Sequence, residues 1–494
     1  MAEPGLAVIG AGPAGLAATL AAAARGVHVT LIDSAEQAGG QFYRQPAPGF
    51  RARRPQALHH QWRTWERLRD GLDTHVRAGR VRYLTDHHVW FVERRGAAGL
   101  TVHALVGPEQ EEPAEVHADA VLLATGGHEK VLPFPGWTLP GVVTAGGAQA
   151  MLKGGLVLPG RTAVVAGTGP LLLPVATGLA AAGATVAALV ESADPAAFVR
   201  RSRALAGRPD KVAEGARYAG LLLRHRVRTL LGHTVVQAHG AERLEAVTIA
   251  ALDRHGRVRP DTRRRLVCDV LAVGHGMLPH TDLADALGCR IDGTDVYADD
   301  EQRTDVPGVW AAGETTGIGG SALSLAEGHI AGRSIAARLA GRVPDPGEWA
   351  AAARTREKLR AFFAAVDSVY APPARWAEQV TDETVVCRCE EVSAGAVREA
   401  VRELGAGDLR TVKLLTRAGM GWCQGRVCGP GVAGVAGCAQ TAGRTPFARP
   451  VPLGVLARAG ETREPQAGES GEPRAGESGE PRAGAERTAQ EPDQ

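Results

Sequence analysis

Four of the chain's seven cysteines form two close pairs whose spacing suits a metal-binding cage. One residue separates Cys387 from Cys389, four separate Cys423 from Cys428, and 33 lie between the pairs. Thiolates are soft ligands, so four of them brought together by a folded loop bind zinc or an iron–sulfur cluster. Structural zinc sites usually space their thiols as CxxC, which favours the iron–sulfur cluster and leaves zinc as the alternative.

A glycine-rich turn near the N-terminus, Gly10-Ala-Gly12-Pro-Ala-Gly15, is the second candidate site. It follows a short apolar run and opens a helix of Ala and Leu, which is the setting of a dinucleotide-binding turn. Gly10 permits the tight turn, Gly12 lets the backbone approach a pyrophosphate, and Gly15 lets the helix lie close to the strand. Asp33, at the end of the next expected strand, is placed to bind a ribose hydroxyl.

Three later segments favour FAD over NAD as the dinucleotide. Gly39-Gly40-Gln41 follows Asp33 at the distance at which flavoproteins of the two-dinucleotide type pass the chain beside the cofactor. Ala124-Thr125-Gly126 and Gly313-Glu314 each end an apolar strand, and Glu314 could bind the ribityl hydroxyls. Ser321 opens a helix whose dipole would stabilise the negative edge of reduced flavin. The residues expected to hold FAD are Gly10, Gly12, Pro13, Ala14, Gly15, Asp33, Gly40, Gln41, Ala124, Thr125, Gly126, Gly313, Glu314 and Ser321.

A second glycine turn, Gly167-Thr-Gly169-Pro-Leu-Leu172, departs from the fingerprint. Leu172 stands where the third glycine belongs, and we expect it to push the helix off the strand and narrow the turn. Glu191 ends the following strand and could still bind a ribose. We therefore predict a domain that keeps the nucleotide-binding shape but binds NAD(P) poorly.

The remaining reactive side chains are interpreted as structural. Cys268 and Cys289 are solitary and Cys438 lies ten residues beyond the cage, so all three are expected to be core thiols. The flavoprotein region has no Cys-x-x-Cys pair, which disfavours disulfide reductase chemistry. His275 and His280 are interpreted as loop or core histidines, and no catalytic acid or base is predicted.

These residues favour an α/β fold with two Rossmann-like domains, a small C-terminal cysteine domain and a disordered tail. The resemblance given below implies that the cysteine domain is an α-rich 2Fe–2S domain. The pattern also predicts a helix within residues 50–75 and a β-meander over residues 81–125. Three near-copies of an eight-residue unit rich in Gly, Pro and charge fill the tail. The expected divisions are an FAD-binding domain at 1–130 and 300–345, a second nucleotide-binding-like domain at 131–299, a helical linker at 346–379, a 2Fe–2S domain at 380–456 and the tail at 461–494.

Composition excludes several classes of function. A net charge of +2 over 494 residues gives no field for nucleic acid or an anionic membrane. No apolar run reaches the roughly 18 residues of a transmembrane helix, and the N-terminus lacks the basic flank of a signal peptide. An odd number of clustered cysteines favours a reducing, cytoplasmic compartment.

Three motifs carry a resemblance to known families. They are Val-Cys387-Arg-Cys389-Glu-Glu-Val, Gly419-Met-Gly-Trp-Cys423-Gln-Gly-Arg-Val-Cys428-Gly-Pro and Gly39-Gly-Gln-Phe-Tyr-Arg44. Residues 5–335 resemble the pyridine-nucleotide-disulfide oxidoreductase-like flavoproteins, and the cysteine module resembles the bacterioferritin-associated-ferredoxin-like fold. Over residues 5–456 the chain resembles one flavoprotein family, which comprises the B subunit of hydrogen cyanide synthase, the A subunits of octopine and nopaline oxidases and the α subunit of D-hydroxyproline dehydrogenase.

This resemblance implies a relay in which FAD accepts electron pairs and a 2Fe–2S cluster on Cys387, Cys389, Cys423 and Cys428 passes them on singly. It also implies partners: a D-amino-acid-oxidase-like FAD subunit that oxidises an amine or amino acid, and a small ferredoxin-like subunit. Two alternatives stay open. One is a stand-alone NAD(P)H-dependent reductase that uses Gly167, Gly169 and Glu191, and the other is a non-catalytic electron-transfer or assembly module with a zinc Cys₄ site.

Overall fold

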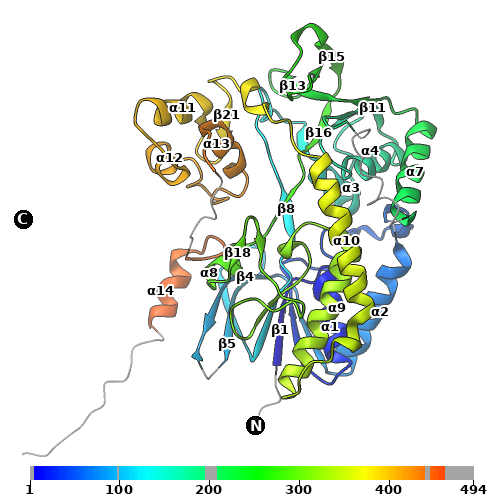
Figure 1. Ribbon diagram of the computed structural model, residues 1–494, viewed down its shortest axis with the longest axis vertical. Helices are drawn as coiled ribbons and strands as arrows, with labels where there is room; N and C mark the ends of the chain where they lie inside the picture. Colours follow the sequence, from blue (N-terminus) through cyan, green and yellow to red (C-terminus); the bar gives the residue numbers. More distant parts are fainter. Residues whose placement is uncertain (1–4, 60, 97–98, 195–208, 440–445, 462–494) are drawn as a thin grey trace, which may run out of the picture. The chain divides into compact units, whose positions relative to one another are not determined.

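The computed structural model describes residues 5–59, 61–96, 99–194, 209–439 and 446–461 (Figure 1). The chain divides into two compact units, residues 1–452 and 453–494. The described part of the second unit is the helix α14 (Leu453–Glu461). The predicted disordered tail therefore lies outside the described residues, except for Glu461. The first unit contains all the other elements.

The first unit begins with a five-stranded parallel sheet of order β20-β7-β1-β2-β3. Alternate residues of β1 enter two different cores: Leu6 and Val8 pack beneath α1, α2 and α9, whereas Ala7 and Ile9 face an antiparallel meander. The sheet strands are β1 (Gly5–Ile9), β2 (His28–Ile32), β3 (Val81–Leu84), β7 (Ala120–Leu123) and β20 (Val309–Ala311). The covering elements are α1 (Pro13–Ala23), α2 (Trp62–Arg77), α9 (Gly320–Leu339), β4 (His87–Arg94), β5 (Leu100–Val106) and β6 (Glu112–Ala118).

Two glycines of α9 allow α1 to cross it at very short range (Figure 1). A Cβ atom at Gly328 would lie 2.1 Å from the Ala14 carbonyl oxygen, and one at Gly332 would lie 2.4 Å from that of Ala18. Larger side chains would separate the helices. This contact fixes the start of α9, and with it Ser321, against the glycine turn that precedes α1.

The predicted meander over residues 81–125 is wrong at both of its ends. Val81 is buried under α2, so β3 joins the parallel sheet beside β2. β7 likewise pairs in parallel with β1, and only β4, β5 and β6 form the antiparallel meander. The reason is the intervening helix α2, which returns the chain in the parallel direction before β3 begins.

A second parallel sheet, of order β12-β11-β10-β16-β9, repeats this architecture. Helices cover one face and an antiparallel meander covers the other. The strands are β9 (Val142–Thr144), β10 (Thr162–Gly167), β11 (Thr185–Glu191), β12 (Thr229–Leu231) and β16 (Val270–Gly274). The helices are α3 (Ala145–Gly155), α4 (Leu172–Ala181) and α7 (Pro209–Arg224), and the meander is β13 (His233–His239), β14 (Ala246–Ala251) and β15 (Arg264–Val267).

Short elements join the two sheets. β8 (Gly127–Glu129) pairs antiparallel with β17 (Met277–Pro279), so the chain crosses twice between the domains at this point. The long helix α10 (Ala350–Val369) occupies the predicted linker, and its Arg360 pairs with Glu327 of α9 at 2.6 Å. Further elements are α8 (Asp282–Ala286), β18 (Ile291–Asp292), β19 (Asp295–Val296) and the 3₁₀ turns η1 (Pro48–Phe50), η2 (Pro55–Leu58), η4 (Pro260–Thr262), η5 (Gly313–Thr316), η6 (Pro346–Trp349) and η7 (Trp376–Gln379).

The cysteine module is a small core of its own. It comprises β21 (Val385–Cys387), β22 (Val392–Ser393), α11 (Ala394–Arg402), α12 (Leu409–Thr416) and α13 (Gly429–Ala436). Trp137 joins it to the second sheet's domain by donating its indole N–H to the carbonyl oxygen of Val385 at 2.6 Å. The predicted class, α/β with two Rossmann-like domains and a small α-rich C-terminal domain, is confirmed. Among the described residues, no helix has the length and apolarity needed to cross a bilayer.

Candidate functional site

The first glycine turn has the geometry of an anion-binding site. Gly10 has φ +108°, and a Cβ atom there would lie 2.3 Å from the Ala124 carbonyl oxygen. A Cβ atom at Gly15 would lie 1.8 Å from the Gly10 carbonyl oxygen. Gly12 is the N-cap of α1, and no described side chain caps that end. The first N–H groups of α1 therefore remain available to a phosphate.

Asp33 holds this turn in place. Its carboxylate accepts hydrogen bonds from the backbone N–H groups of Ala11 and Ala35. Burial raises the pKa of Asp33, and these two N–H groups oppose the shift. The carboxylate thus ties the glycine turn to the chain just after β2, and Asp33 also lines the cavity described next.

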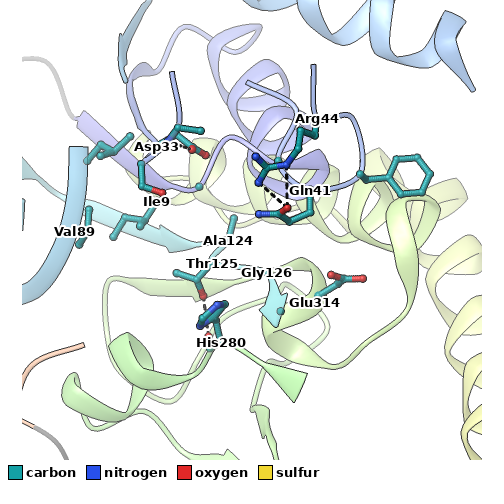
Figure 2. A pocket seen from close by; sticks show the side chains of 18 of the residues that line it. Ile9, Asp33, Gln41, Arg44, Val89, Ala124, Thr125, Gly126, His280 and Glu314 are labelled. Carbon is teal, nitrogen blue, oxygen red and sulfur yellow. Dashed lines mark hydrogen bonds between the residues drawn. The ribbon is translucent and has the colours of Figure 1, made fainter. Parts of the chain in front are cut away.

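A cavity of about 970 Å³ extends from the glycine turn, and its size is that of a cofactor site (Figure 2). Of the predicted FAD residues, all except Gly15 and Gly313 line it. These two glycines act through close backbone approaches, since a Cβ atom at Gly313 would lie 2.7 Å from that of Ala14. Figure 2 shows Ile9, Asp33 and Val89 on one side of the cavity and Gln41, Arg44 and Glu314 on the other.

Glu314 and Thr125 face the cavity in different ways. Burial raises the pKa of the Glu314 carboxyl, and the Gly320 N–H at the start of α9 opposes that shift. The Thr125 hydroxyl donates to the carbonyl oxygen of His280 at 2.8 Å, so it joins two strands and contributes its methyl and backbone groups to the wall. Glu314 is therefore a polar group suited to bind hydroxyls, and Thr125 is a structural one.

Two cationic residues at the Gln41 end, Arg44 and Lys153, were not among the predicted ligands. Arg44 donates to the Gln41 side-chain oxygen at 2.7 Å. Burial, aided by the charge of Arg44, lowers the pKa of Lys153 to about 8. Lys153 in turn approaches the Phe42 carbonyl oxygen at 3.4 Å. The basic residue that ends Gly-Gly-Gln-Phe-Tyr-Arg44 was the signal in the sequence for this end of the cavity.

His280 was interpreted as a loop or core histidine, and it lies on the cavity wall. Its ring is 4.7 Å from that of His128, and its Nδ1 is 3.8 Å from the Asp282 carboxylate. His275, by contrast, is buried as expected, and burial lowers its pKa to about 4. Cys268 and Cys289 are buried thiols, as predicted, whereas Cys438 is only partly buried.

The four paired cysteines converge in the C-terminal module. The Cys428 thiol contacts Cys423, and this hydrogen bond lowers the pKa of Cys423 to about 4 while it raises that of Cys428. Cys423 also contacts Cys389, and Cys428 also contacts Cys387. The contacts thus run from Cys389 through Cys423 and Cys428 to Cys387. In the part of the chain with described coordinates, no three His, Cys, Asp or Glu side chains are grouped as a site for a metal ion.

Glycines keep the space around these thiols open. A Cβ atom at Gly421 would lie 2.2 Å from the Cys389 Cβ. Gly419 has φ +84°, and its N–H approaches the Cys387 sulfur at 3.5 Å. N–H donors of this kind stabilise negative charge on a cluster's sulfurs. Four soft thiols in a glycine-lined pocket fit an iron–sulfur cluster by the chemistry of the donor set.

Cys423 brings the two sites together, because it lines the same cavity as the first glycine turn. Trp422 and Arg426 of its loop line that cavity too. Three further residues after the cysteine module, at 448–450, complete this side of the wall. Sequence reasoning missed Asp282, Arg426 and Arg449 because each comes from a segment remote from the fingerprint.

In the second glycine turn, the carboxylate of Glu191 is bonded to the turn itself. Glu191 is 6% exposed and accepts hydrogen bonds from the N–H groups of Gly169 and Ala193, at 3.0 and 2.9 Å. Burial raises the pKa of this carboxyl to about 7. Leu172 is 1% exposed in the core beneath the sheet, and α4 begins at that residue. Helix α4 therefore begins three residues after the second glycine of its turn, whereas α1 begins directly after the second glycine of the first turn.

Comparison with known proteins defines the class. Residues 4–337 match the family described as pyridine nucleotide-disulphide oxidoreductase, and residues 385–435 match the BFD-like [2Fe-2S] binding domain. The chain belongs to the first family and carries the second domain. These matches imply FAD in the first region and an iron–sulfur cluster on the C-terminal module.

Individual relatives narrow the class to which the chain is similar. It is 35% identical to hydrogen cyanide synthase subunit HcnB of Pseudomonas aeruginosa, over 85% of this chain and 90% of that one. It is 32% identical to the A subunit of opine oxidase from Agrobacterium tumefaciens, over 86% of this chain and 83% of that one. The predicted resemblance is thereby confirmed. Among solved structures, L-proline dehydrogenase from P. horikoshii shares the fold, with a TM-score of 0.62 and 22% identity over 92% of this chain and 79% of that one.

Proposed function

We propose that this chain is the electron-transferring subunit of a heteromeric amine or amino-acid dehydrogenase, of the opine, hydroxyproline or glycine type. The observation that carries the proposal is the single cavity lined at once by the glycine turn, by Glu314 and by the cluster ligand Cys423. A dinucleotide held along this wall would lie against the cysteine loop. The similarity to subunits of hydrogen cyanide synthase and opine oxidase supports the choice of donor.

Each part of the wall has a role in this function. The free N–H groups at the start of α1 would bind the pyrophosphate, Asp33 the ribose, and Glu314 the ribityl hydroxyls. Ser321 lies in the first turn of α9, whose positive end would stabilise negative charge on the flavin ring. When bound, FAD exchanges electrons in pairs or singly and a 2Fe–2S cluster carries one at a time. The cage is Cys387, Cys389, Cys423 and Cys428.

The donor is oxidised elsewhere in the complex. A D-amino-acid-oxidase-like subunit would take two electrons and a proton, as hydride, from the C–H bond next to the amine nitrogen. The C–N bond becomes C=N, and the second proton leaves from the N–H group. The two electrons would enter this chain, and a small ferredoxin-like protein would receive them singly. The seven free cysteines suit the reducing cytoplasm.

A second candidate function is a stand-alone NAD(P)H-dependent reductase, and one observation favours it. The side-chain atoms Thr168 Oγ1, Ser192 Oγ and His275 Nδ1 are buried at the carboxyl ends of neighbouring strands, and no described residue bonds them. Such atoms commonly await a ligand or water. The late start of α4 weighs against a dinucleotide there.

The test is to purify the full chain anaerobically, quantify flavin, iron, zinc and acid-labile sulfide, and then add possible donors. We expect FAD, two irons and two sulfides, no reduction by NADH or NADPH, and reduction when the amine-oxidising partner and its substrate are supplied. Rapid flavin bleaching by a nicotinamide nucleotide would establish the reductase instead. Zinc in place of iron would establish the assembly module.

A further inference from the structure

After the cysteine module, the chain returns to the flavoprotein region along strand β4. The Phe447 ring packs edge-on against Trp90, with centroids 5.0 Å apart. The N–H of Ala448 donates to the Trp90 carbonyl oxygen at 2.9 Å, and the Arg449 guanidinium lies 2.9 Å from the His88 ring nitrogen. Residues 447–450, here called the return segment, are thus attached to β4 by apolar, backbone and side-chain contacts.

The return segment forms the wall of the cavity at its Asp33 end. Ala448, Arg449 and Pro450 line the cavity together with His87 at the start of β4. The His87 N–H donates to the Asp33 carbonyl oxygen at 2.9 Å, so this wall adjoins the residue expected to bind the adenosine ribose. Figure 2 shows Asp33 and Val89 on this side, opposite Gln41 and Glu314. The C-terminal region therefore encloses the adenosine end of the site.

One side chain links this wall to the cysteine loop. Arg426 lies between Cys423 and Cys428, and its Nε donates to the Asp282 carboxylate at 3.0 Å. Its Nη2 donates to the Ala448 carbonyl oxygen, and its Nη1 approaches the Cys423 carbonyl oxygen at 3.4 Å. A planar guanidinium can hold several acceptors in a fixed geometry, which a lysine cannot do. Arg426 thus fastens the loop, the return segment and α8 to one another.

We propose that Arg426 is a positioning residue that couples the cysteine cage to the FAD site, so that loading of the cage raises the affinity for FAD. The inference rests on the proposed function, since it assumes both cofactors. A cluster bound by Cys423 and Cys428 orders the loop between them, and the ordered loop holds Arg426 against Asp282 and Ala448. Without the cluster, the wall at the adenosine end loosens. Coupling is reciprocal, so bound FAD also favours the loaded cage.

The experiment measures FAD dissociation constants by flavin fluorescence for the full chain, with its cluster and after the cluster has been removed by oxidation and chelation. For the native chain we expect the affinity to fall about fivefold or more when the cluster is lost. Arg426→Gln should bind FAD weakly with the cluster present, and cluster removal should change that affinity little. Arg426→Lys should resemble Arg426→Gln, because one ammonium cannot reach all three acceptors.

The matched control is Arg417→Gln. Arg417 makes a more exposed arginine–carboxylate pair, with Glu390 at 2.8 Å inside the cysteine module, and is not among the residues that line the cavity. This variant should keep both the native FAD affinity and its dependence on the cluster. Asp282→Asn tests the same coupling from outside the cysteine loop, because it weakens the contact between Arg426 and residue 282. The EPR signal of the cluster should be unchanged in this variant.

The outcomes separate the two proposals. If the native chain binds FAD and carries the cluster, but Arg426→Gln and Asp282→Asn retain native affinity and native dependence on the cluster, the coupling is disproved and the proposed function stands. If Arg426→Gln cannot hold a cluster at all, the FAD affinity of Asp282→Asn with and without its cluster decides whether the coupling exists. A native chain that binds neither FAD nor a cluster overturns both proposals.

Discussion

The two glycine turns of this chain share a backbone plan and differ at the third glycine of the fingerprint. Each begins with a glycine of positive φ packed on the neighbouring strand: a Cβ atom would lie 2.3 Å from a carbonyl oxygen at Gly10 and 1.7 Å from one at Gly167. Each is held by an acid after the next strand, Asp33 or Glu191. The third position is Gly15 in one and Leu172 in the other.

That difference changes where the helix begins. α1 starts at Pro13, directly after the second glycine of its turn, whereas α4 starts at Leu172, three residues after Gly169. The Leu172 side chain fills the core that a close helix would occupy. The comparison teaches that the strand, turn and acid can persist when the helix after the turn begins later along the chain.

The largest effect should come from Gly15→Ala. The added Cβ would lie 1.8 Å from the Gly10 carbonyl oxygen, so the helix must retreat from the turn and its N–H groups from the pyrophosphate. We expect complete loss of bound FAD after purification, measured by the visible absorbance of the protein. Retention of native FAD content would show that close helix approach is not what distinguishes the two turns.

The matched change in the other turn, Leu172→Ala, should act on stability alone. It empties a fully buried site and should lower the free energy of unfolding by about 2–5 kcal/mol, measured by urea denaturation. FAD content should be native, because Leu172 lies away from the residues that line the FAD cavity. Loss of FAD from this variant would contradict the assignment of the two turns.

The acid of the second turn should confer a pH dependence. Burial raises the pKa of Glu191 from 4.5 to about 7, so the folded state binds the proton more tightly than the unfolded state. The resulting stabilisation is complete below about pH 4.5 and is lost as pH rises through about 7, by up to about 3 kcal/mol. In Glu191→Gln this decline should be absent from urea unfolding curves taken between pH 5 and 8. An unchanged decline would assign it to another group.

The smallest change in nucleotide binding is expected from Leu172→Gly, which restores the third glycine to the second turn. Like Leu172→Ala, it also lowers stability, because it empties the same buried site. Gly169 would still donate to Glu191, and α4 would still be packed by its later residues such as Val175. We therefore expect no gain in NADH affinity by fluorescence titration, with the native chain as control. Submicromolar NADH binding by the variant would mean that Leu172 by itself blocks the site.

Much of the fold was readable in the sequence because its signals are local. The positive φ at Gly10, the acid at Asp33 and the paired cysteines each depend on residue types at fixed short spacing. The prediction failed for β3, whose place in the parallel sheet follows from the packing of α2. Local signals also could not place His280 on the cavity wall, because its neighbours there come from distant segments of the chain.

The sequence by itself determined the fingerprint turn, the thiol cage and the class of protein that combines them. The tertiary structure alone decided that Arg426, Asp282 and the return segment meet, and that Cys423 shares a cavity with Asp33. The physical reason is range. Turn geometry and ligand spacing are fixed by neighbours along the chain. The contact of Arg426 with Asp282 instead joins residues 144 apart, and it exists only once the cysteine module has packed against the flavoprotein region.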